Sequence, residues 1–200
     1  MSRKKTFQVF IVFSLLFFSA TLLNAQDLDL TRFNENRIQL NKTGMTILMG
    51  WAATNLAVGA YGNFQKSGQT KYFHQMNAMW NTVNLGIGIF GYLGLTSQNP
   101  EALTFAETLK ESMNFEKILL FNAGLDIGYM AMGGILWERG LRKVNDRFIG
   151  YGKSLILQGG FLFAFDAVLF YLNQQHNQEL INILSNVTLS PSGVQISIPF

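Results

Sequence analysis

The chain has 200 residues, of which 48% are hydrophobic and only 14% are charged, against about 25% charged in an average soluble protein. It contains no cysteine, which excludes disulfides, thiolate metal sites and cysteine nucleophiles. The formal charge of +3 equals the contribution of Arg3, Lys4 and Lys5, so a chain that has lost its first residues is balanced, and no nucleic-acid partner is indicated. This composition predicts a membrane protein whose first partner is the lipid bilayer.

Residues 1–25 have the pattern of a secretory signal peptide. A basic start precedes an apolar run at 9–18, and Ala25 stands at the expected cleavage point. Leu23 departs from the small residue that is usual at its position, so an uncleaved first anchor is the alternative. Either outcome places residue 26 on the outer side of the membrane.

Residues 26–42 follow as an outer segment with three acids and three bases. Thr31 is a suitable N-cap, and Phe33, Ile38 and Leu40 supply apolar positions. We therefore expect a short amphipathic helix that lies at the outer membrane interface.

Four segments of the remaining chain are long enough to span a bilayer, which takes about 20 apolar residues. The third span carries Asp126, and the fourth carries Lys153 near its start and Asp166 further along. The sequence thus predicts an all-α membrane protein with a four-helix transmembrane domain over 43–186. Its expected spans are 43–64, 73–97, 115–137 and 149–172, with a short surface helix at 98–114 between the second and the third.

The last residues, 187–200, change from helical spacing to strict alternation. Val194, Ile196, Ile198 and Phe200 alternate after a short Pro-Ser-Gly break, which predicts a small β-hairpin or an extended tail. A terminal Phe is also found on the closing strand of outer-membrane barrels. The chain upstream lacks the alternating ten-residue strands that such a barrel needs, so a helical protein is preferred.

The charges of the loops predict an orientation, because short cytoplasmic loops are enriched in Lys and Arg. Loop 65–74 has two bases and no acid, and loop 138–153 has five bases and two acids, whereas 98–117 has four acids and two bases. This pattern agrees with the outside start that the signal peptide demands. It predicts a multi-pass protein of a bacterial-type inner membrane, with both mature termini on the periplasmic side.

The predicted topology also consists of two similar helical hairpins. Placing Asn55 over Asp126 brings Gly62 over Gly133, and each following span again contains an Asn or Asp. A tandem repeat of one hairpin is therefore a hypothesis, and its two halves would be related by an axis along the membrane normal.

Polar residues inside the predicted spans form the candidate site. Counting 1.5 Å per residue from the cytoplasmic ends places Asn55, Asn84 and Asp126 at a common depth, with Asn122 and Asp166 about 8 Å nearer the outer face. Helical spacing puts small and polar residues on one face of every span, which is typical of helix packing in membranes. A second reading remains open: Asn would suffice for packing, so Asp126 and Asp166, without Lys or Arg at their depth, are candidates for binding a proton or cation.

Other kinds of site are less well supported. If the protein has a small-molecule pocket, its expected place is near Trp51 and Tyr129, beside Asn122 and Asp166. His74 and His176 are predicted on opposite sides of the membrane, so no metal site is expected. The glycines of 86–91 match a dinucleotide fingerprint but lie within an apolar helix. An aspartyl hydrolase would need the two acids at one depth, so no catalytic residue and no cofactor is expected.

Taken together, the sequence favours an integral membrane protein of unknown activity that serves as a structural or interaction component of the cell envelope. Its protein partner would be a second copy of the chain or another envelope protein. The alternative is a small proton- or cation-coupled transporter or channel-like protein that uses Asp126 and Asp166.

Overall fold

The computed structural model describes residues 3–185, 187–190 and 193–196, and the side chains of residues 30–180. The described chain is all-helical apart from one short pair of strands. The helices are α1 (Arg3–Gln65), α2 (Gly68–Thr96), α3 (Phe105–Lys143) and α4 (Asp146–Ser185), with a 3-10 turn η1 (Pro100–Ala102) between α2 and α3. Strand β1 (Val187–Ser190) pairs antiparallel with β2 (Gly193–Ile196), and Val187 lies opposite Ile196. Ile198 and Phe200 of the predicted alternation lie outside the described residues.

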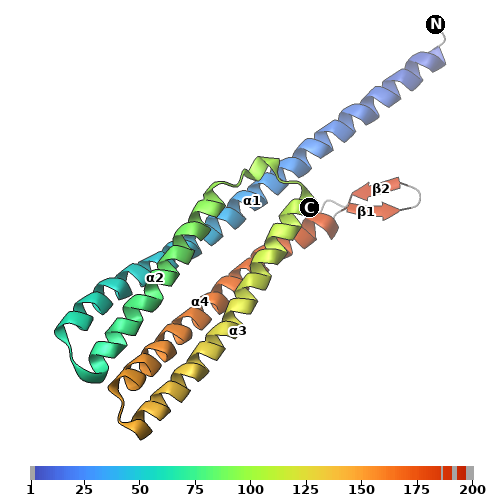
Figure 1. Ribbon diagram of the computed structural model, residues 1–200. Helices are drawn as coiled ribbons and strands as arrows, with labels where there is room; N and C mark the ends of the chain where they lie inside the picture. The colour runs from blue at the N-terminus through green and yellow to red at the C-terminus, as the bar shows by residue number, and fades with distance from the viewer. Residues whose placement is uncertain (1–2, 186, 191–192, 197–200) are drawn as a thin grey trace.

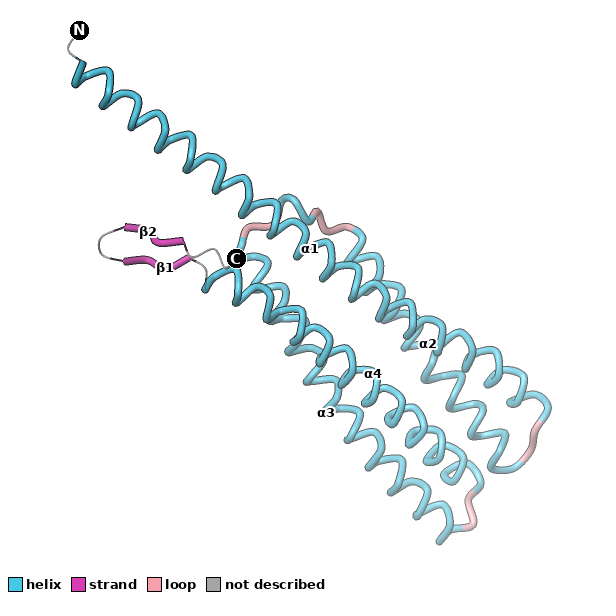
Figure 2. The backbone as a smooth tube through the Cα atoms, turned by 180° about the vertical axis from the view of Figure 1, so that it is seen from behind, coloured by secondary structure: helices cyan, strands magenta, loops and turns pink. Residues whose placement is uncertain are grey.

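The four helices form two antiparallel hairpins that lie side by side (Figure 1). Helix α1 packs along α2, and α3 packs along α4, while the two hairpins meet mainly through α2 and α4. The turns at 66–67 and 144–145 lie at one end of the bundle, and the connection through η1 lies at the other (Figure 2). In the described part of the chain, no Cα atom of α2 lies within 8 Å of one in α3. The backbones of these two helices are therefore further apart than those of the directly packed pairs.

Buried residues recur every seven positions along the helices. This spacing keeps one stripe of each helix against its neighbour and is typical of left-handed coiled-coil packing. The buried series are Asn34, Asn41, Leu48, Asn55 and Gly62 on α1, Ser112, Leu119, Asp126, Gly133 and Gly140 on α3, and Gly152, Gly159, Asp166, Asn173 and Leu180 on α4.

Glycines set the closest approach of α3 and α4. A methyl group added to Gly133 would lie 2.8 Å from the carbonyl oxygen of Gly152. The first hairpin has the same kind of contact, since a methyl group on Gly59 would lie 2.9 Å from the Cβ atom of Ala78. Small residues at these crossings let the backbones touch, as in helix pairs of membrane proteins.

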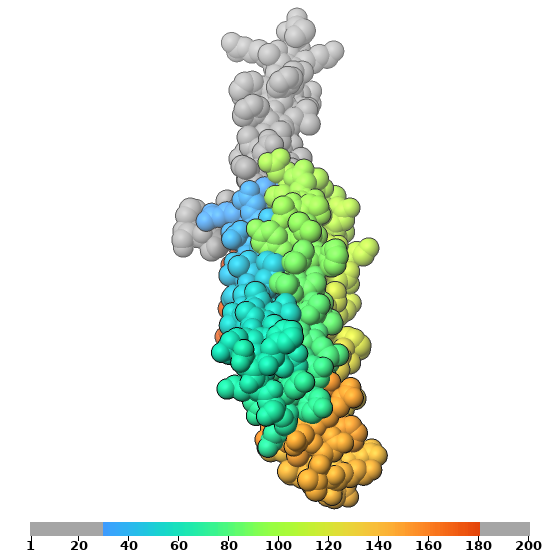
Figure 3. Space-filling view, turned by 60° about the vertical axis from the view of Figure 1, so that its left-hand side comes forward, coloured from blue at the N-terminus to red at the C-terminus, as the bar shows by residue number. Residues whose placement is uncertain are grey.

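The distribution of polar and apolar side chains is the reverse of that in a soluble protein. Among the described residues, nine of the ten largest fully buried side chains are polar or charged, and Leu180 is the exception. Large apolar side chains instead lie exposed on the outside of the bundle, whose elongated shape is seen in Figure 3. The most exposed on the four helices include Phe64 at 83%, Phe90 at 76%, Phe121 at 66% and Val168 at 59%. Water does not tolerate so much apolar surface, whereas lipid does.

Two helices of the described chain, α3 and α4, are long and apolar enough to cross a membrane. Helix α1 covers the expected span 43–64 and α2 covers 73–96 of the next, but in the described chain neither has an equally long and apolar stretch. Asn77, Asn81 and Asn84 are all buried on α2, and they lower its average hydropathy although its outer face is apolar. The four-span arrangement therefore stays a prediction at this point.

The outer segments differ from the sequence-based expectation. Residues 26–42 do not form a separate interfacial helix, because α1 runs unbroken from Arg3 to Gln65. Phe33, Arg37 and Ile38 are buried in the bundle, since their seven-residue stripe continues in phase with the rest of α1. The expected surface helix at 98–114 is likewise the η1 turn followed by the first turns of α3. The charged residues of these two segments led us to expect separate helices, but α1 and α3 continue through them.

Helix α3 begins at a capping box that explains why it starts at Phe105. The Thr104 backbone N–H donates to Glu107 Oε2 at 2.9 Å, and the Glu107 backbone N–H donates back to Thr104 Oγ1 at 3.4 Å. The Thr104 backbone N–H and its hydroxyl both donate to Glu107 Oε2, and these two hydrogen bonds hold the pKa of the Glu107 carboxyl below its usual value.

Candidate functional site

A cavity of about 220 Å³ lies between α2 and α3. Helix α4 lies behind it, and one residue of α1 reaches its edge. The lining combines two acids and two amides with aromatic and aliphatic side chains. It consists of Leu48 from α1, Trp80, Val83, Asn84 and Ile87 from α2, Asn122, Leu125, Asp126 and Tyr129 from α3, and Leu162, Phe165 and Asp166 from α4.

Asp126 and Asp166 are neighbours in this cavity, with their carboxyl groups placed to share a hydrogen bond. Both are buried, at 3% and 6% exposure. As two carboxylates they offer only acceptor oxygens, and Asp126 Oδ2 then has no hydrogen-bond partner in the structure. Among the described side chains, neither acid forms an ion pair with a basic residue. One proton or cation between them would satisfy the pair.

The position of the turn explains why these acids meet. Helix α3 runs to Lys143 and α4 starts at Asp146, so Asp126 and Asp166 each lie about twenty positions from the turn. The expected depth difference of about 8 Å came from counting from the ends of the apolar stretches, which are not the ends of the helices. Gly159 adds to the contact, since a methyl group there would lie 2.9 Å from the carbonyl oxygen of Asp126.

An aromatic pair crosses the open side of the cavity. The rings of Trp80 on α2 and Tyr129 on α3 pack edge to face, with centroids 4.7 Å apart and an angle of 77° between planes. The indole Nε1 of Trp80 is buried and has no hydrogen-bond partner in the structure. Asn84 and Asn122 line the same cavity as the two acids. Four of the five residues of the predicted polar cluster are thus together here.

Asn55, the fifth member, lies in a second polar layer nearer the turns. Asn77 Nδ2 donates to Asn55 Oδ1 at 2.8 Å, and Gln158 Nε2 donates to Asn77 Oδ1. The indole of Trp51 donates to Gln158 Oε1 at 3.0 Å and stacks on Phe161, with centroids 3.8 Å apart. Of the two residues expected to form a pocket, Tyr129 therefore lines the cavity and Trp51 lies outside it.

Sequence reasoning missed Trp80 as a cavity residue and Gln158 as the link between layers. Both could have been found from helical phase. Trp80 lies four positions before Asn84 and therefore on the same side of α2. Gln158 precedes Gly159, a member of the seven-residue series of α4. Neither was singled out from the sequence, because Gln158 is uncharged and Trp80 resembles the many other aromatic residues of the apolar helices.

A third polar group closes the other end of the bundle. Arg37 is only 2% exposed, and its Nη2 donates to Gln98 Oε1 at 3.0 Å and to Asn34 Oδ1 at 3.4 Å. Asn34 Nδ2 in turn donates to Thr108 Oγ1 at 2.8 Å. Burial lowers the pKa of the Arg37 guanidinium, and nearby Glu111 opposes this. The group holds α1, α3 and the η1 connection together.

The two histidines lie far apart along the bundle. His176 of α4 stacks on Phe33 of α1, with ring centroids 4.2 Å apart, whereas His74 of α2 packs against Gly62 of α1 near the turns. Within the described part of the chain, no group of three or more metal-ligating side chains is found.

The fold and the cavity define a helical bundle with an apolar outside, a polar inside and a buried pair of acids. The chain belongs to a family of unknown function, DUF6992, which matches residues 47–167. This region holds both polar layers of the middle of the bundle and ends just after Asp166. No curated protein and no solved structure matches the chain.

Proposed function

We propose that this protein is a four-span membrane protein that binds a proton or a small cation between Asp126 and Asp166. The reversed polarity of the bundle supports the membrane location of all four helices. On α1 and α2, exposed Phe64, Phe90 and Leu93 face outward while asparagines face inward. Such inward placement of polar groups is what a lipid surrounding requires.

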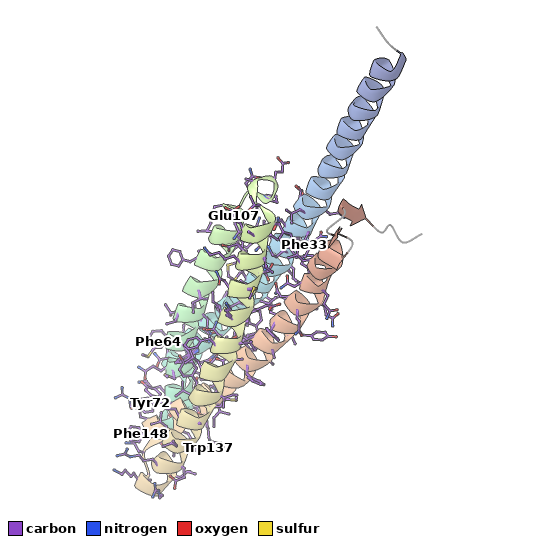
Figure 4. The ribbon with its side chains drawn as sticks, turned by 90° about the vertical axis from the view of Figure 1, so that its right-hand side faces the viewer. Phe33, Phe64, Tyr72, Glu107, Trp137 and Phe148 are labelled. Atoms are coloured by element: carbon purple, nitrogen blue, oxygen red, sulfur yellow. The ribbon has the colours of Figure 1, made fainter. Side chains whose placement is uncertain are left out.

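The ends of the bundle support the orientation. Phe64, Tyr72, Trp137 and Phe148 gather at the end where the turns lie, and Glu107 lies towards the opposite end (Figure 4). Basic residues accompany these aromatics, for example Lys153, whose Nζ lies 5.3 Å from the centroid of the Trp137 ring. Aromatic belts lie at both membrane interfaces, and an excess of Lys and Arg marks the cytoplasmic one. The proposal therefore places the turns in the cytoplasm and both mature termini in the periplasm, after cleavage of residues 1–25.

The buried acid pair carries the proposed activity. Two carboxylates in contact repel one another, and among the described side chains no basic residue pairs with either to offset its burial. A proton or a cation bound between them removes the repulsion and supplies the missing donor. The cavity then gives the bound ion a place from which it can leave, which a purely structural hydrogen bond does not need.

Proton flux into proteoliposomes tests this proposal. Purified protein is reconstituted with an entrapped pH-sensitive dye, and a membrane potential is imposed with potassium and valinomycin. The wild type should acidify the interior faster than empty vesicles, and Asp126→Asn and Asp166→Asn should each lose most of that rate. Sodium and potassium gradients, followed with ion-sensitive dyes, form the second arm.

Asp146→Asn is the matched control, because it makes the same chemical change at an exposed acid on the first turn of α4. It should retain the wild-type rate. A wild type that moves neither protons nor alkali cations would sink the proposal and favour a structural role in the envelope.

A further inference from the structure

We infer that the cavity beside the acid pair binds a small organic ammonium ion with an apolar body. The inference rests on the proposed function, since it uses the same two carboxyl groups, and it names the class of ligand that they take together with the aromatic pair.

The charge of the site fits a monovalent organic cation. Asp126 and Asp166 supply the negative charge, and Asp126 Oδ2 is buried and unpartnered at the cavity. An ammonium group has up to three N–H donors and no acceptor, which matches a site that offers carboxylate and amide oxygens. Asn84 and Asn122 provide those amide oxygens within the same lining.

The aromatic pair distinguishes an organic cation from a bare metal ion. Trp80 and Tyr129 stand over the open side of the cavity that holds the acids. Ring faces attract ammonium groups, with Trp the strongest, by about 0.5–2 kcal/mol. Hard metal ions are bound by oxygen ligands, and an indole contributes none.

The rest of the lining fits an apolar body of limited size. Val83, Ile87 and Leu162 are among the aliphatic side chains that face the cavity. Its volume of about 220 Å³ is below the roughly 300–1,000 Å³ of sites for drug-sized ligands. The space suits one ring or a short branched chain beside the ammonium group.

The open side of the cavity gives such a ligand a route from the membrane. No Cα atom of α2 lies within 8 Å of one in α3, and the cavity lies between these helices with the Trp80 and Tyr129 rings packed across it. A neutral amine dissolved in the bilayer can reach the pair when the two carboxyl groups share one proton. The proton then moves from the carboxyl oxygen to the amine nitrogen, one O–H bond breaks and one N–H bond forms, and the site keeps a net charge of −1. No separate charge has to cross the lipid.

Calorimetric titration of the purified protein in detergent micelles tests the inference. The probe is 2-phenylethylammonium chloride, with 2-phenylethanol as a neutral ligand of the same shape and sodium chloride as the inorganic cation. The wild type should bind the ammonium saturably and at least tenfold more tightly than the alcohol. This comparison needs no variant and does not depend on how well a variant folds.

Variants then locate the site. Asp166→Asn should weaken ammonium binding at least tenfold, and Trp80→Leu should weaken it by roughly 2- to 30-fold, the range that the cation–π energy implies. Trp137→Leu and Asp146→Asn are the matched controls, because both residues lie outside the cavity lining, and they should bind as the wild type does. Equal binding of the alcohol, or unchanged binding by Asp166→Asn, would overturn the inference.

The two proposals fail separately. Proton flux through the wild type without binding of the probe refutes the organic ligand and leaves the proton function standing. Saturable binding of the probe without proton or alkali-cation flux refutes the movement of inorganic cations and leaves the organic ligand standing. Binding of sodium at the acid pair without binding of the probe also refutes the organic ligand.

Discussion

Arg37 shows how a single residue can hold together the end of this bundle that lies opposite the two turns. Its guanidinium is buried, and it donates to Asn34 on its own helix and to Gln98 after the end of α2. A buried guanidinium is tolerated only when its donors are satisfied. Because Asn34 also pairs with Thr108 of α3, one side chain links three parts of the chain.

Replacing Arg37 by Ala should lower the free energy of unfolding by about 1–3 kcal/mol, since buried Asn34 and half-buried Gln98 each lose a hydrogen bond from the guanidinium. Arg37→Lys should recover only part of this loss, because one ammonium cannot reproduce the planar fork of guanidinium donors. Thermal unfolding in detergent, followed by circular dichroism, measures both. Arg32→Ala, at an exposed position on the same helix, should change nothing measurable. Equal losses for Arg32 and Arg37 would contradict this role.

Along each helix, glycine and asparagine occupy many of the interface positions that leucine occupies in a soluble coiled coil. The stripe with a seven-residue period is buried on every helix, yet much of it is small or polar. Backbone contact at glycines brings the helices close, and Asn, Gln and Asp side chains then hydrogen-bond across the narrow interface. Shape and polarity are therefore matched along each helix.

Two adjacent glycines on α3 test this packing. A methyl group on Gly133 would lie 2.8 Å from Gly152 O, whereas one on Gly134 would meet no atom within 4 Å. Gly133→Ala should thus cost about 1–3 kcal/mol, because it forces α3 and α4 apart. Gly134→Ala should be neutral or stabilise by up to about 1 kcal/mol, since alanine favours the helix. The free energies of unfolding of the two variants, measured under one condition, test this difference. An equal change for both would argue against glycine-mediated contact.

Much of the inward face could be predicted from the sequence. The series through Asn77 and Asn84, and the one through Gly152, Gly159 and Asp166, are periodic, and all five residues are buried. Periodicity fixes which face turns inward, because it depends only on helix geometry.

Depth and helix ends could not be predicted in the same way. They depend on where the turns fall, and charged residues such as those of 26–42 hid the continuation of α1. The contact of Asp126 with Asp166 followed only once the turn at 144–145 was known. Cross-helix partners such as Gln158 with Asn77 likewise depend on how the two hairpins dock.

The whole molecule is a helical bundle with polar layers along its axis and apolar side chains around its outside. Helix α3 has 39 residues, or about 58 Å at 1.5 Å per residue, while the hydrocarbon core of a bilayer is about 30 Å thick. In the proposed four-span arrangement, its ends therefore project from the membrane. The Arg37 group lies at one projecting end and the basic turns at the other, which leaves the acid pair between them.

The central claim is that this bundle crosses the membrane four times with its turns in the cytoplasm. The absence of native cysteine makes the claim directly measurable, because every introduced thiol is unique. Ser67→Cys and Val144→Cys place a thiol in the two turns, and Ala102→Cys and Gln178→Cys place one at the opposite end, all at exposed positions. A membrane-impermeant maleimide applied to intact spheroplasts should label Ala102→Cys and Gln178→Cys, and it should label the two turn variants only after permeabilisation. Labelling of a turn variant in intact cells to the same extent as Ala102→Cys would contradict the four-span arrangement.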